Sequence, residues 1–405
     1  MHDVIIIGAG ASGLIAAHVC GADSLKVLLL EGKPRPGLKL RITGGGRCNI
    51  SNLNMSHWAF HSRHSRTVKN VLAAFSHRKT MAFFEAAGVA LQAENDGCLF
   101  PAAQSAQVVL DALLDRLGPN VSLQVSRKVT GIDDADGLFR VSCGSTVFSA
   151  RAVILCAGGR SYPGTGSDGS GYPLAERLGH TIVPLRPALT PLATDDADWK
   201  ALAGISLPCT LRTKTVDGRD IRYDGPLLFT HFGFSGLCVL SISRHWIENP
   251  DHPVVANFLP RENDTAFRET ILRAEKDHPR RMVKTWLSEY LPLRLAETVV
   301  KKAGLEPSLI LGGTTRKQRE NLIRYLFHCP LPVSGPLGYA KAEVTSGGVD
   351  LSEVDPKTLE SRIVPRLFLA GEILDVDGPI GGYNLQWAWS SGVVAAKGVV
   401  EVLKS

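Results

Sequence analysis

The stretch that determines the fold class is Val4-Ile5-Ile6-Ile7-Gly8-Ala9-Gly10-Ala11-Ser12-Gly13, near the start of the 405-residue chain. A run of four β-branched residues predicts a buried parallel strand, and the GxGxxG turn after it opens an apolar helix over residues 14–20. A second buried strand follows over residues 26–30 and ends at Glu31. This order, with an acidic residue about 20 positions after the glycines, predicts a Rossmann-type unit that binds a dinucleotide.

Each part of this unit has a separate task in nucleotide binding. Gly8 permits the tight turn, Gly10 lets a pyrophosphate approach the backbone, and Gly13 allows the helix to pack closely on the strand. The helix N-terminus favours the negative phosphates, and Glu31 would accept hydrogen bonds from the ribose hydroxyls. Because FAD-binding and NAD-binding proteins share this unit, it leaves the choice of cofactor open.

Two further glycine-rich segments favour FAD. The first, Thr43-Gly44-Gly45-Gly46-Arg47-Cys48-Asn49, has three consecutive glycines whose amides can crowd a ligand, with Arg47 and Asn49 as further donors. In the second, a strand ends at Gly371-Glu372 before the turn Gly381-Gly382-Tyr383-Asn384 and a long helix. Such a turn suits a ribityl chain, and the helix N-terminus would place partial positive charge beside the N1 and C2 carbonyl edge of a flavin.

These motifs and the strand end Ala157-Gly158-Gly159 resemble the bacterial flavoprotein family of bile-acid reductase-like (BaiN/YhiN-type) proteins and aminoacetone oxidase-like enzymes. The resemblance spans nearly the whole chain. It implies an α/β fold in which a discontinuous Rossmann-type FAD-binding domain carries an inserted β-barrel-like domain and a helical cap. We predict the FAD-binding domain at 1–188 plus 335–405, the inserted β-rich substrate domain at 189–261 and the helical cap at 262–334.

The resemblance also assigns residues to the cofactor. Val129 is similar to the strand residue whose backbone meets the adenine in this broader flavoprotein group. The complete FAD-binding set predicted from the motifs and the resemblance is Gly8, Gly10, Ala11, Ser12, Gly13, Glu31, Gly32, Lys33, Lys39, Gly45, Gly46, Arg47, Cys48, Asn49, Val129, Ala157, Gly158, Gly159, Gly371, Glu372, Gly382, Tyr383, Asn384, Leu385 and Gln386.

For catalysis we predict His231, because an imidazole titrating near neutrality suits proton transfer to or from a substrate. It lies in Thr230–Gly236, which resembles the TH-x-G-x-SG segment of the family's inserted domain, although Leu237 stands where a proline is usual. The alternative is a hydrogen-bonded structural histidine. Cys48 has no cysteine at short spacing, so we interpret it as a packing or flavin-contact residue rather than a redox thiol. Tyr383 stays open between proton donor and stacking residue.

A second GxGxxG match, Gly164–Gly169, is followed by Arg186 about 20 residues later, as an NADP site would require. Tyr162-Pro163 and other residues separate the match from the strand that ends at Cys156. We therefore interpret it as a connection within the flavin domain, and NADH or NADPH, if used, would reduce the flavin from the substrate cleft.

Composition argues against several other classes of protein. The formal charge of +6 is small for this length, and we interpret Arg63, Arg66 and Lys69 as a solvated face, so we expect no nucleic-acid partner. None of the eight cysteines forms a CxxC pair, so no metal site is expected, and free thiols indicate a cytoplasmic location. We expect neither a signal peptide nor a membrane span. The oligomeric state is left open.

Together these observations predict an FAD-dependent oxidoreductase that acts on a small or medium organic substrate. The resemblance implies two chemistries: NAD(P)H-dependent reduction of a C=C bond conjugated to a carbonyl, which we favour, or oxidation of an aminoacetone-like amine with O₂. A flavin-binding sensor or RNA-associated protein is the alternative from another class, and it would hold FAD without turnover.

Overall fold

The computed structural model describes residues 1–94, 96–135 and 137–404. Contacts within it divide the chain into two compact units. The first unit is formed by Met1–Pro187 together with Glu343–Ser405, and the second by Ala188–Ala342. Each unit has a hydrophobic core of its own.

The first unit is built on a seven-stranded sheet whose path runs β6-β2-β1-β9-β8-β7, with β19 also paired to β9. Strands β6, β2, β1, β9 and β19 are parallel, while β7 and β8 form an antiparallel meander with the beginning of β9. The central strands are apolar on both faces because both faces are buried. The strands are β1 (His2–Ile7), β2 (Val27–Leu30), β6 (Val121–Gln124), β7 (Gly131–Ala135), β8 (Leu138–Cys143), β9 (Thr146–Leu155) and β19 (Leu367–Leu369).

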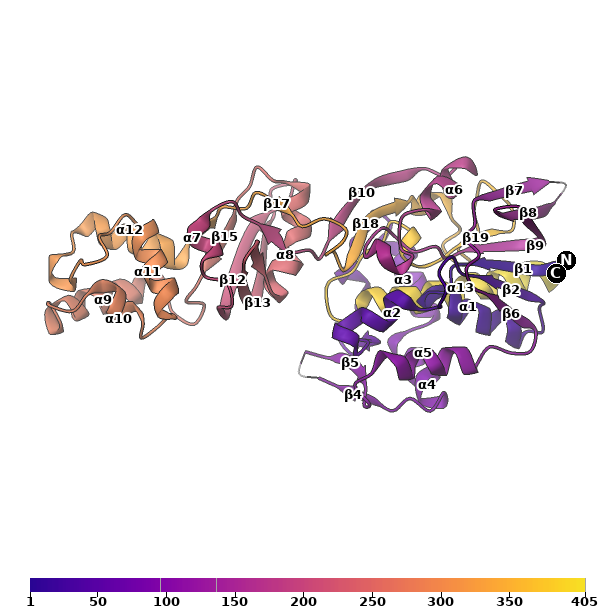
Figure 1. Cartoon of the computed structure of the whole chain (residues 1–405), viewed down its shortest axis with the longest axis horizontal. Helices are drawn as coiled ribbons and strands as arrows, with labels where there is room; N and C mark the ends of the chain where they lie inside the picture. Colours follow the sequence, from indigo (N-terminus) through magenta and orange to yellow (C-terminus); the bar gives the residue numbers. More distant parts are fainter. Residues whose placement is uncertain (95, 136, 405) are drawn as a thin grey trace. The chain divides into compact units, whose positions relative to one another are not determined.

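Two helices from opposite ends of the chain, α1 (Ala11–Ala22) and α13 (Tyr383–Lys404), pack against each other. Their approach needs a small residue, because a Cβ on Gly392 would lie 2.5 Å from the Ser12 carbonyl oxygen. In Figure 1 the yellow α13 runs beside the indigo α1, and the two chain ends lie close together. Near the C-terminal end of α13, Lys404 pairs with Asp23 at 2.7 Å. The other elements of this unit are α2 (Leu38–Ile42), β3 (Ser51–Asn52), α3 (Ser65–Ala74), α4 (His77–Ala86), β4 (Leu91–Ala93), β5 (Cys98–Pro101), α5 (Ala106–Asp115), α6 (Gly171–Arg177), β10 (Ile182–Ala188) and β18 (Val344–Val349).

The predicted α/β fold of Rossmann type is confirmed. Strand β9 pairs first with β8 and then with β19 along the same edge. Strand β6 lies outside the meander, since it pairs in parallel with β2.

The second unit contains an antiparallel sheet in the order β16-β15-β12-β13-β14-β11-β17, with α8 packed against β12 and β13. One hydrophobic cluster extends from Trp199 and Phe229 near the sheet to Phe267 and Trp286 in the helical part. The elements are β11 (Leu192–Ala193), α7 (Ala197–Lys200), β12 (Ser206–Lys214), β13 (Asp220–Thr230), β14 (Gly233–Ser235), α8 (Leu237–Glu248), β15 (Val254–Asn257), α9 (Asp264–Asp277), α10 (Val283–Leu287), α11 (Leu293–Lys302), α12 (Arg316–Phe327), β16 (Cys329–Leu331) and β17 (Gly335–Pro336).

The second unit begins at Ala188 and ends at Ala342. Because β17 pairs with β11, the segment after residue 334 contributes a strand to the sheet of the second unit. The predicted domain boundaries, including the division into β-rich and helical domains at 261/262, stay a prediction.

Neither unit offers a membrane span or a metal cluster within the part of the chain that the structure describes. No helix there combines the length and the apolar composition needed to cross a bilayer. No three or more His, Cys, Asp or Glu side chains in the same ranges are grouped so that they could hold a metal ion.

Candidate functional site

A pocket in the first unit opens where β1, β2 and β9 end, which is the edge at which doubly wound sheets bind ligands. The segments on its wall are far apart in sequence. They are residues 7–12, 30–33, 37–40, 43, 127–129, 156–158, 165–168, 170, 174, 343–344, 372, 376, 384–385 and 387–388.

The glycine turn between β1 and α1 forms one side of the pocket, and its three glycines differ in surroundings. A Cβ on Gly8 would lie 2.4 Å from the Cys156 carbonyl oxygen, and a Cβ on Gly13 would lie 1.8 Å from the Gly8 carbonyl oxygen. Around Gly10, by contrast, a Cβ would meet nothing within 4 Å. Gly8 and Gly13 are therefore required by packing, whereas the space beside Gly10 belongs to the pocket.

Glu31, directly after β2, presents a carboxylate to the same pocket. Its Oε2 accepts a hydrogen bond from the Ala9 backbone N–H at 2.9 Å, and its Oε1 accepts one from the Lys33 N–H at 2.8 Å. Burial raises the pKa of Glu31, and the two backbone donors act in the opposite direction. The carboxylate is thus held in place beside the glycine turn, with lone pairs left for a ribose hydroxyl.

We expect Glu31→Gln to weaken FAD binding by about 2 kcal/mol, or roughly 30-fold in Kd, because hydrogen bonds to a charged acceptor are lost. A glutamine would also turn its NH₂ group toward one of the two backbone donors. Titration of apo-protein with FAD, followed by flavin fluorescence, measures the change. The matched control is Asp3→Asn, since Asp3 also accepts from a backbone N–H, that of Lys26 at 2.9 Å, but lies outside the pocket. Equal effects of the two variants would contradict the role of Glu31.

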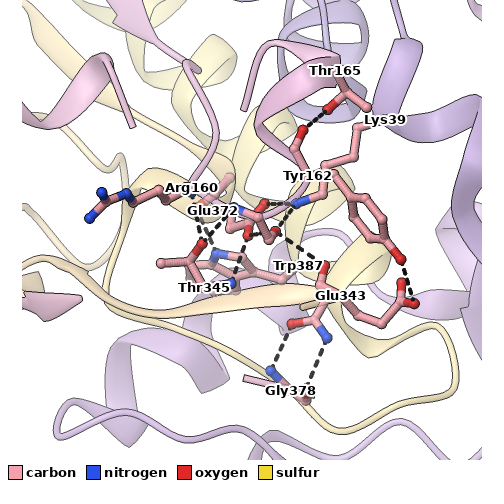
Figure 2. Close-up of polar contacts among 12 residues, drawn as sticks. Lys39, Arg160, Tyr162, Thr165, Glu343, Thr345, Glu372, Gly378 and Trp387 are labelled. Atoms are coloured by element: carbon pink, nitrogen blue, oxygen red, sulfur yellow. Dashed lines mark hydrogen bonds and ion pairs between the residues drawn. The ribbon is translucent and has the colours of Figure 1, made fainter. Parts of the chain in front are cut away.

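A second polar group on the wall is centred on Glu372 and Lys39 (Figure 2). The Lys39 ammonium pairs with Glu372 Oε2 at 2.6 Å and also donates to the Ser161 hydroxyl. Glu372 Oε1 accepts from the Ser161 hydroxyl at 2.9 Å and from the Thr345 backbone N–H at 2.8 Å. This network joins α2, the loop after β9, β18 and the turn after β19, so it orients one lysine and one carboxylate toward the pocket.

Tyr162 and Glu343 form a further pair beside this network, also drawn in Figure 2. The Tyr162 hydroxyl donates to Glu343 Oε1 at 3.2 Å, and Glu343 lies on the pocket wall. Burial and the neighbouring Glu343 carboxylate raise the pKa of Tyr162 to about 12, so the phenol keeps its proton at neutral pH. Tyr162 has a φ of +53°, a left-handed conformation that is uncommon for residues other than glycine.

The turn before α13 is clamped by Asn384. Its Oδ1 accepts from the Gly378 N–H at 2.8 Å and its Nδ2 donates to the Gly378 carbonyl at 2.9 Å. The Trp387 indole N–H donates to the Gly371 carbonyl at 3.1 Å, which ties the helix to the turn after β19. Asn384, Leu385 and Trp387 thereby bring the N-terminal end of α13 to the pocket.

Of the residues predicted to bind FAD, the structure brings one group together on the pocket wall. These are Gly8, Gly10, Ala11, Ser12, Glu31, Gly32, Lys33, Lys39, Val129, Ala157, Gly158, Glu372, Asn384 and Leu385. The predicted residues that do not line this pocket are Gly13, Gly45, Gly46, Arg47, Cys48, Asn49, Gly159, Gly371, Gly382, Tyr383 and Gln386. A direct contact of any of these residues with FAD stays a prediction.

Several of the predicted residues that do not line the pocket make packing contacts elsewhere, and these contacts account for the kind of side chain at each position. The Arg47 guanidinium lies over the Phe100 ring, 4.0 Å from its centroid, and pairs with Glu94 at 2.6 Å. Cys48 is fully buried, and burial raises the pKa of its thiol to about 12, which agrees with a packing role. Gln386 is also fully buried, and its Oε1 accepts from Ser51 at 2.6 Å.

The two glycine-rich segments that favoured FAD do meet in the fold. A Cβ on Gly382 would lie 2.4 Å from the Ser51 carbonyl oxygen and 2.7 Å from the Asn49 side chain. The Tyr383 hydroxyl donates to the Asn54 carbonyl at 3.2 Å. Glycine at 382 is therefore required by the close approach of these segments.

Sequence reasoning missed the part of the wall contributed by the second GxGxxG match. Thr165, Gly166, Ser167 and Asp168 line the same pocket, in a loop that leads from β9 into α6. The buried Ser167 hydroxyl has no hydrogen-bond partner among the described residues. A polar atom left unpaired on a pocket wall fits an occupant with hydrogen-bonding groups of its own. In the sequence, the glycine-rich loop itself was the signal for this part of the pocket wall. The loop lies in the first unit.

The hydrogen-bonding groups on the pocket wall fit FAD. A dinucleotide pyrophosphate needs the open space at Gly10 and the helix N-terminus, and a ribose needs the Glu31 carboxylate. A family model described as the HI0933-like protein Rossmann domain matches residues 2–398. The chain belongs to this family. HI0933-like proteins are the group that the motifs predicted, and the chain is accordingly an FAD-dependent oxidoreductase.

Three relatives match this HI0933-like chain along essentially its whole length. The ribosomal RNA dihydrouridine synthase of Escherichia coli (strain K12) is 34% identical over 408 residues, covering 100% of this chain and 99% of the relative. The Haemophilus influenzae protein of the same name is 34% identical over 398 residues, with 97% of each chain covered. The 3-dehydro-bile acid delta(4,6)-reductase of Clostridium scindens is 32% identical over 410 residues, covering 99% and 100%.

His231, the predicted catalytic residue of this HI0933-like chain, belongs to the second unit and not to the pocket wall. It lies in the turn between β13 and β14, where its exposed imidazole is 5.0 Å from the Phe232 ring. Within residues 1–94, 96–135 and 137–404, no side chain or backbone group forms a hydrogen bond with this imidazole. The alternative of a hydrogen-bonded structural histidine therefore has no support among the described residues. Its role in catalysis stays a prediction.

Proposed function

We propose that this protein uses NADH or NADPH to reduce a C=C bond that is conjugated to a carbonyl group. The observation that carries the proposal is the reaction shared by relatives that match the full chain. A dihydrouridine synthase adds hydrogen across the uracil C5=C6 bond, which is conjugated to the C4 carbonyl, and a bile acid delta(4,6)-reductase acts on C=C bonds of a 3-dehydro steroid. Their substrates differ in size and polarity, but the bond reduced is of the same kind.

The reaction requires a hydride at the β carbon of the conjugated bond and a proton at the α carbon. FAD, when bound, would supply this hydride, with NADH or NADPH as the reductant. The residues on the pocket wall would hold this cofactor: the turn at Gly10 and α1 would receive the pyrophosphate, and Glu31 would receive a ribose. Lys39 and Glu372 fix a charged pair beside the turn before α13.

We propose uridine in RNA as the substrate to test first, because two relatives at 34% identity are named for it. A steroid dienone is the second substrate, after the Clostridium scindens relative. This choice departs from the sequence-based expectation of a small-molecule substrate without nucleic acid, which neither the comparisons nor the structure tests.

The testing experiment is anaerobic stopped-flow absorbance of the FAD-loaded protein at the oxidised-flavin band. We expect NADH or NADPH to bleach the band, and a uridine-containing RNA or a steroid dienone then to restore it. Mass spectrometry should find the product with two additional hydrogen atoms. If neither nucleotide bleaches the flavin, while aminoacetone does and O₂ restores the colour, the reductase proposal fails and the oxidase is correct.

His231→Ala tests the predicted acid in the second unit. We expect FAD content to be unchanged, because His231 lies outside the pocket wall, and reduction of the C=C acceptor to slow at least about tenfold, since positioned acids contribute rate factors of this size or larger. Bleaching by NAD(P)H should keep its wild-type rate, because that step does not use this proton. A wild-type rate in both half-reactions would remove His231 from the mechanism.

A further inference from the structure

Trp58 is the most exposed tryptophan of the chain, with 78% of its surface accessible to solvent. It lies in a single 3₁₀ turn, His57–Ala59, whose first N–H groups are capped by Ser56: the Ser56 hydroxyl accepts from the Trp58 N–H at 3.3 Å. The His57 imidazole lies against the indole, with ring centroids 4.5 Å apart. An indole of this size is normally buried, so its exposure on an ordered turn needs an explanation.

The turn that carries Trp58 is anchored to the wall of the flavin pocket. Phe60 packs on Trp387, with ring centroids 6.4 Å apart, and Trp387 lines the pocket. The next residue, His61, forms an antiparallel bridge with Asp377, in which the His61 N–H donates to the Asp377 carbonyl at 2.8 Å. Trp58 is therefore displayed from a segment that is fixed directly against the turn before α13.

Three cations follow Trp58 in the chain. Arg63, Arg66 and Lys69 are exposed, and no hydrogen bond or ion pair links their side chains to any described residue. Arg66 and Lys69 stand three residues apart in α3, on one helix face, and α3 contains no acidic residue. The nearby carboxylate of Asp350 is paired with His64 at 3.2 Å. Two like charges on one face destabilise a helix slightly, so stability does not account for them.

We propose that these four side chains, the Trp58 surface, bind a single strand of RNA. A base would stack on the indole, and Arg63, Arg66 and Lys69 would meet the phosphates. Proteins that bind single-stranded nucleic acids combine these two features: aromatic side chains on which bases stack, and unpaired cations along the phosphate backbone. The 3₁₀ turn contacts α3, which keeps the aromatic and basic parts together. The inference rests on the proposed function and adds where the RNA is held: beside the flavin pocket in the first unit.

Fluorescence anisotropy tests the proposal, with a fluorescein-labelled, uridine-rich 20-nucleotide RNA and the oxidised, FAD-loaded full-length protein. We expect Trp58→Ala to weaken binding about 5- to 150-fold, the range found when a stacked base loses its aromatic partner. Trp58→Phe should retain most of the affinity. Arg66→Glu combined with Lys69→Glu should weaken binding and lower the slope of log Kd against log salt by about 1.4, since each phosphate contact contributes about 0.7.

The matched control is Arg273→Glu combined with Lys276→Glu in α9. These two exposed cations have the same spacing, and no described residue pairs with their side chains. An equal loss in this control, unchanged affinity in Trp58→Ala, or no binding by the wild-type protein would overturn the proposal. So would self-association that is lost in Trp58→Ala at unchanged RNA affinity, because the surface would then be an interface between copies of the chain.

The outcome separates this inference from the proposed function, because the binding assay contains no reductant. Wild-type protein that binds RNA through Trp58 but adds no hydrogen to uridine would overturn the proposed substrate and leave the surface in place. Reduction of uridine in RNA at the same rate with Trp58→Ala would overturn the surface alone.

Discussion

Replacing Gly10 with valine is expected to give a folded protein that is purified without its yellow colour. The backbone at Gly10 has φ −84° and ψ −167°, which valine adopts without strain, and a Cβ there meets no protein atom within 4 Å. The added side chain would instead occupy the space that the pyrophosphate needs. We expect a loss of about 3 kcal/mol in FAD binding, or roughly 150-fold in Kd, which is the upper part of the range for overfilled sites.

The measurement is the ratio of flavin absorbance to protein absorbance after purification, followed by titration of the apo-protein with FAD. Far-UV circular dichroism should be unchanged, and Gly10→Ala should show a smaller loss of affinity. A Gly10→Val protein that is still yellow, with one FAD for each chain, would remove the pyrophosphate from this turn.

Gly13→Ala should have the opposite phenotype, a loss of folded protein rather than a selective loss of cofactor. In a helix, alanine is normally more stable than glycine by about 1 kcal/mol. At this position the Cβ would lie 1.8 Å from the Gly8 carbonyl oxygen, which is backbone and cannot move aside without distorting the turn. We expect this overlap to cost about 3 kcal/mol or more, so the net effect is destabilising by about 2 kcal/mol or more.

Urea unfolding of the FAD-free proteins, followed by circular dichroism, measures this difference in the free energy of unfolding. Gly10→Ala is the control in the same turn, and we expect its stability to stay within about 0.5 kcal/mol of the wild-type value. If Gly13→Ala unfolded at the wild-type urea concentration, the close packing of α1 on the end of β1 would be wrong.

The family relation changes how the small excess of positive charge is interpreted. As a bulk property, +6 on 405 residues says little about a partner. In the fold, however, Arg63, Arg66 and Lys69 lack described partners and follow an exposed Trp58. For RNA binding, the distribution of unpaired cations is more informative than the net charge.

Part of the fold and of the candidate site could be predicted from the sequence, because this part depends on residues that are neighbours in the chain. The unit from β1 to Glu31 spans about 30 residues, and its strand, glycine turn, helix and acidic end each follow from local backbone preferences and hydrophobic pattern. The Gly371–Asn384 region was found in the same way. The motif resemblance then supplied the family, which the match over residues 2–398 confirmed.

Other features depended on which strands became neighbours. Ser167 and Glu343 reach the pocket, and Tyr162 bonds to Glu343, because β9 pairs with β1 and β18 follows the inserted unit back into the first one. The directions of Arg47 and Cys48, away from the pocket and into Phe100 and the core, were likewise set by packing. Local sequence determines backbone conformation over a few turns, but the side chains that meet at a pocket come from segments joined by long-range strand pairing and burial, and these are properties of the whole fold.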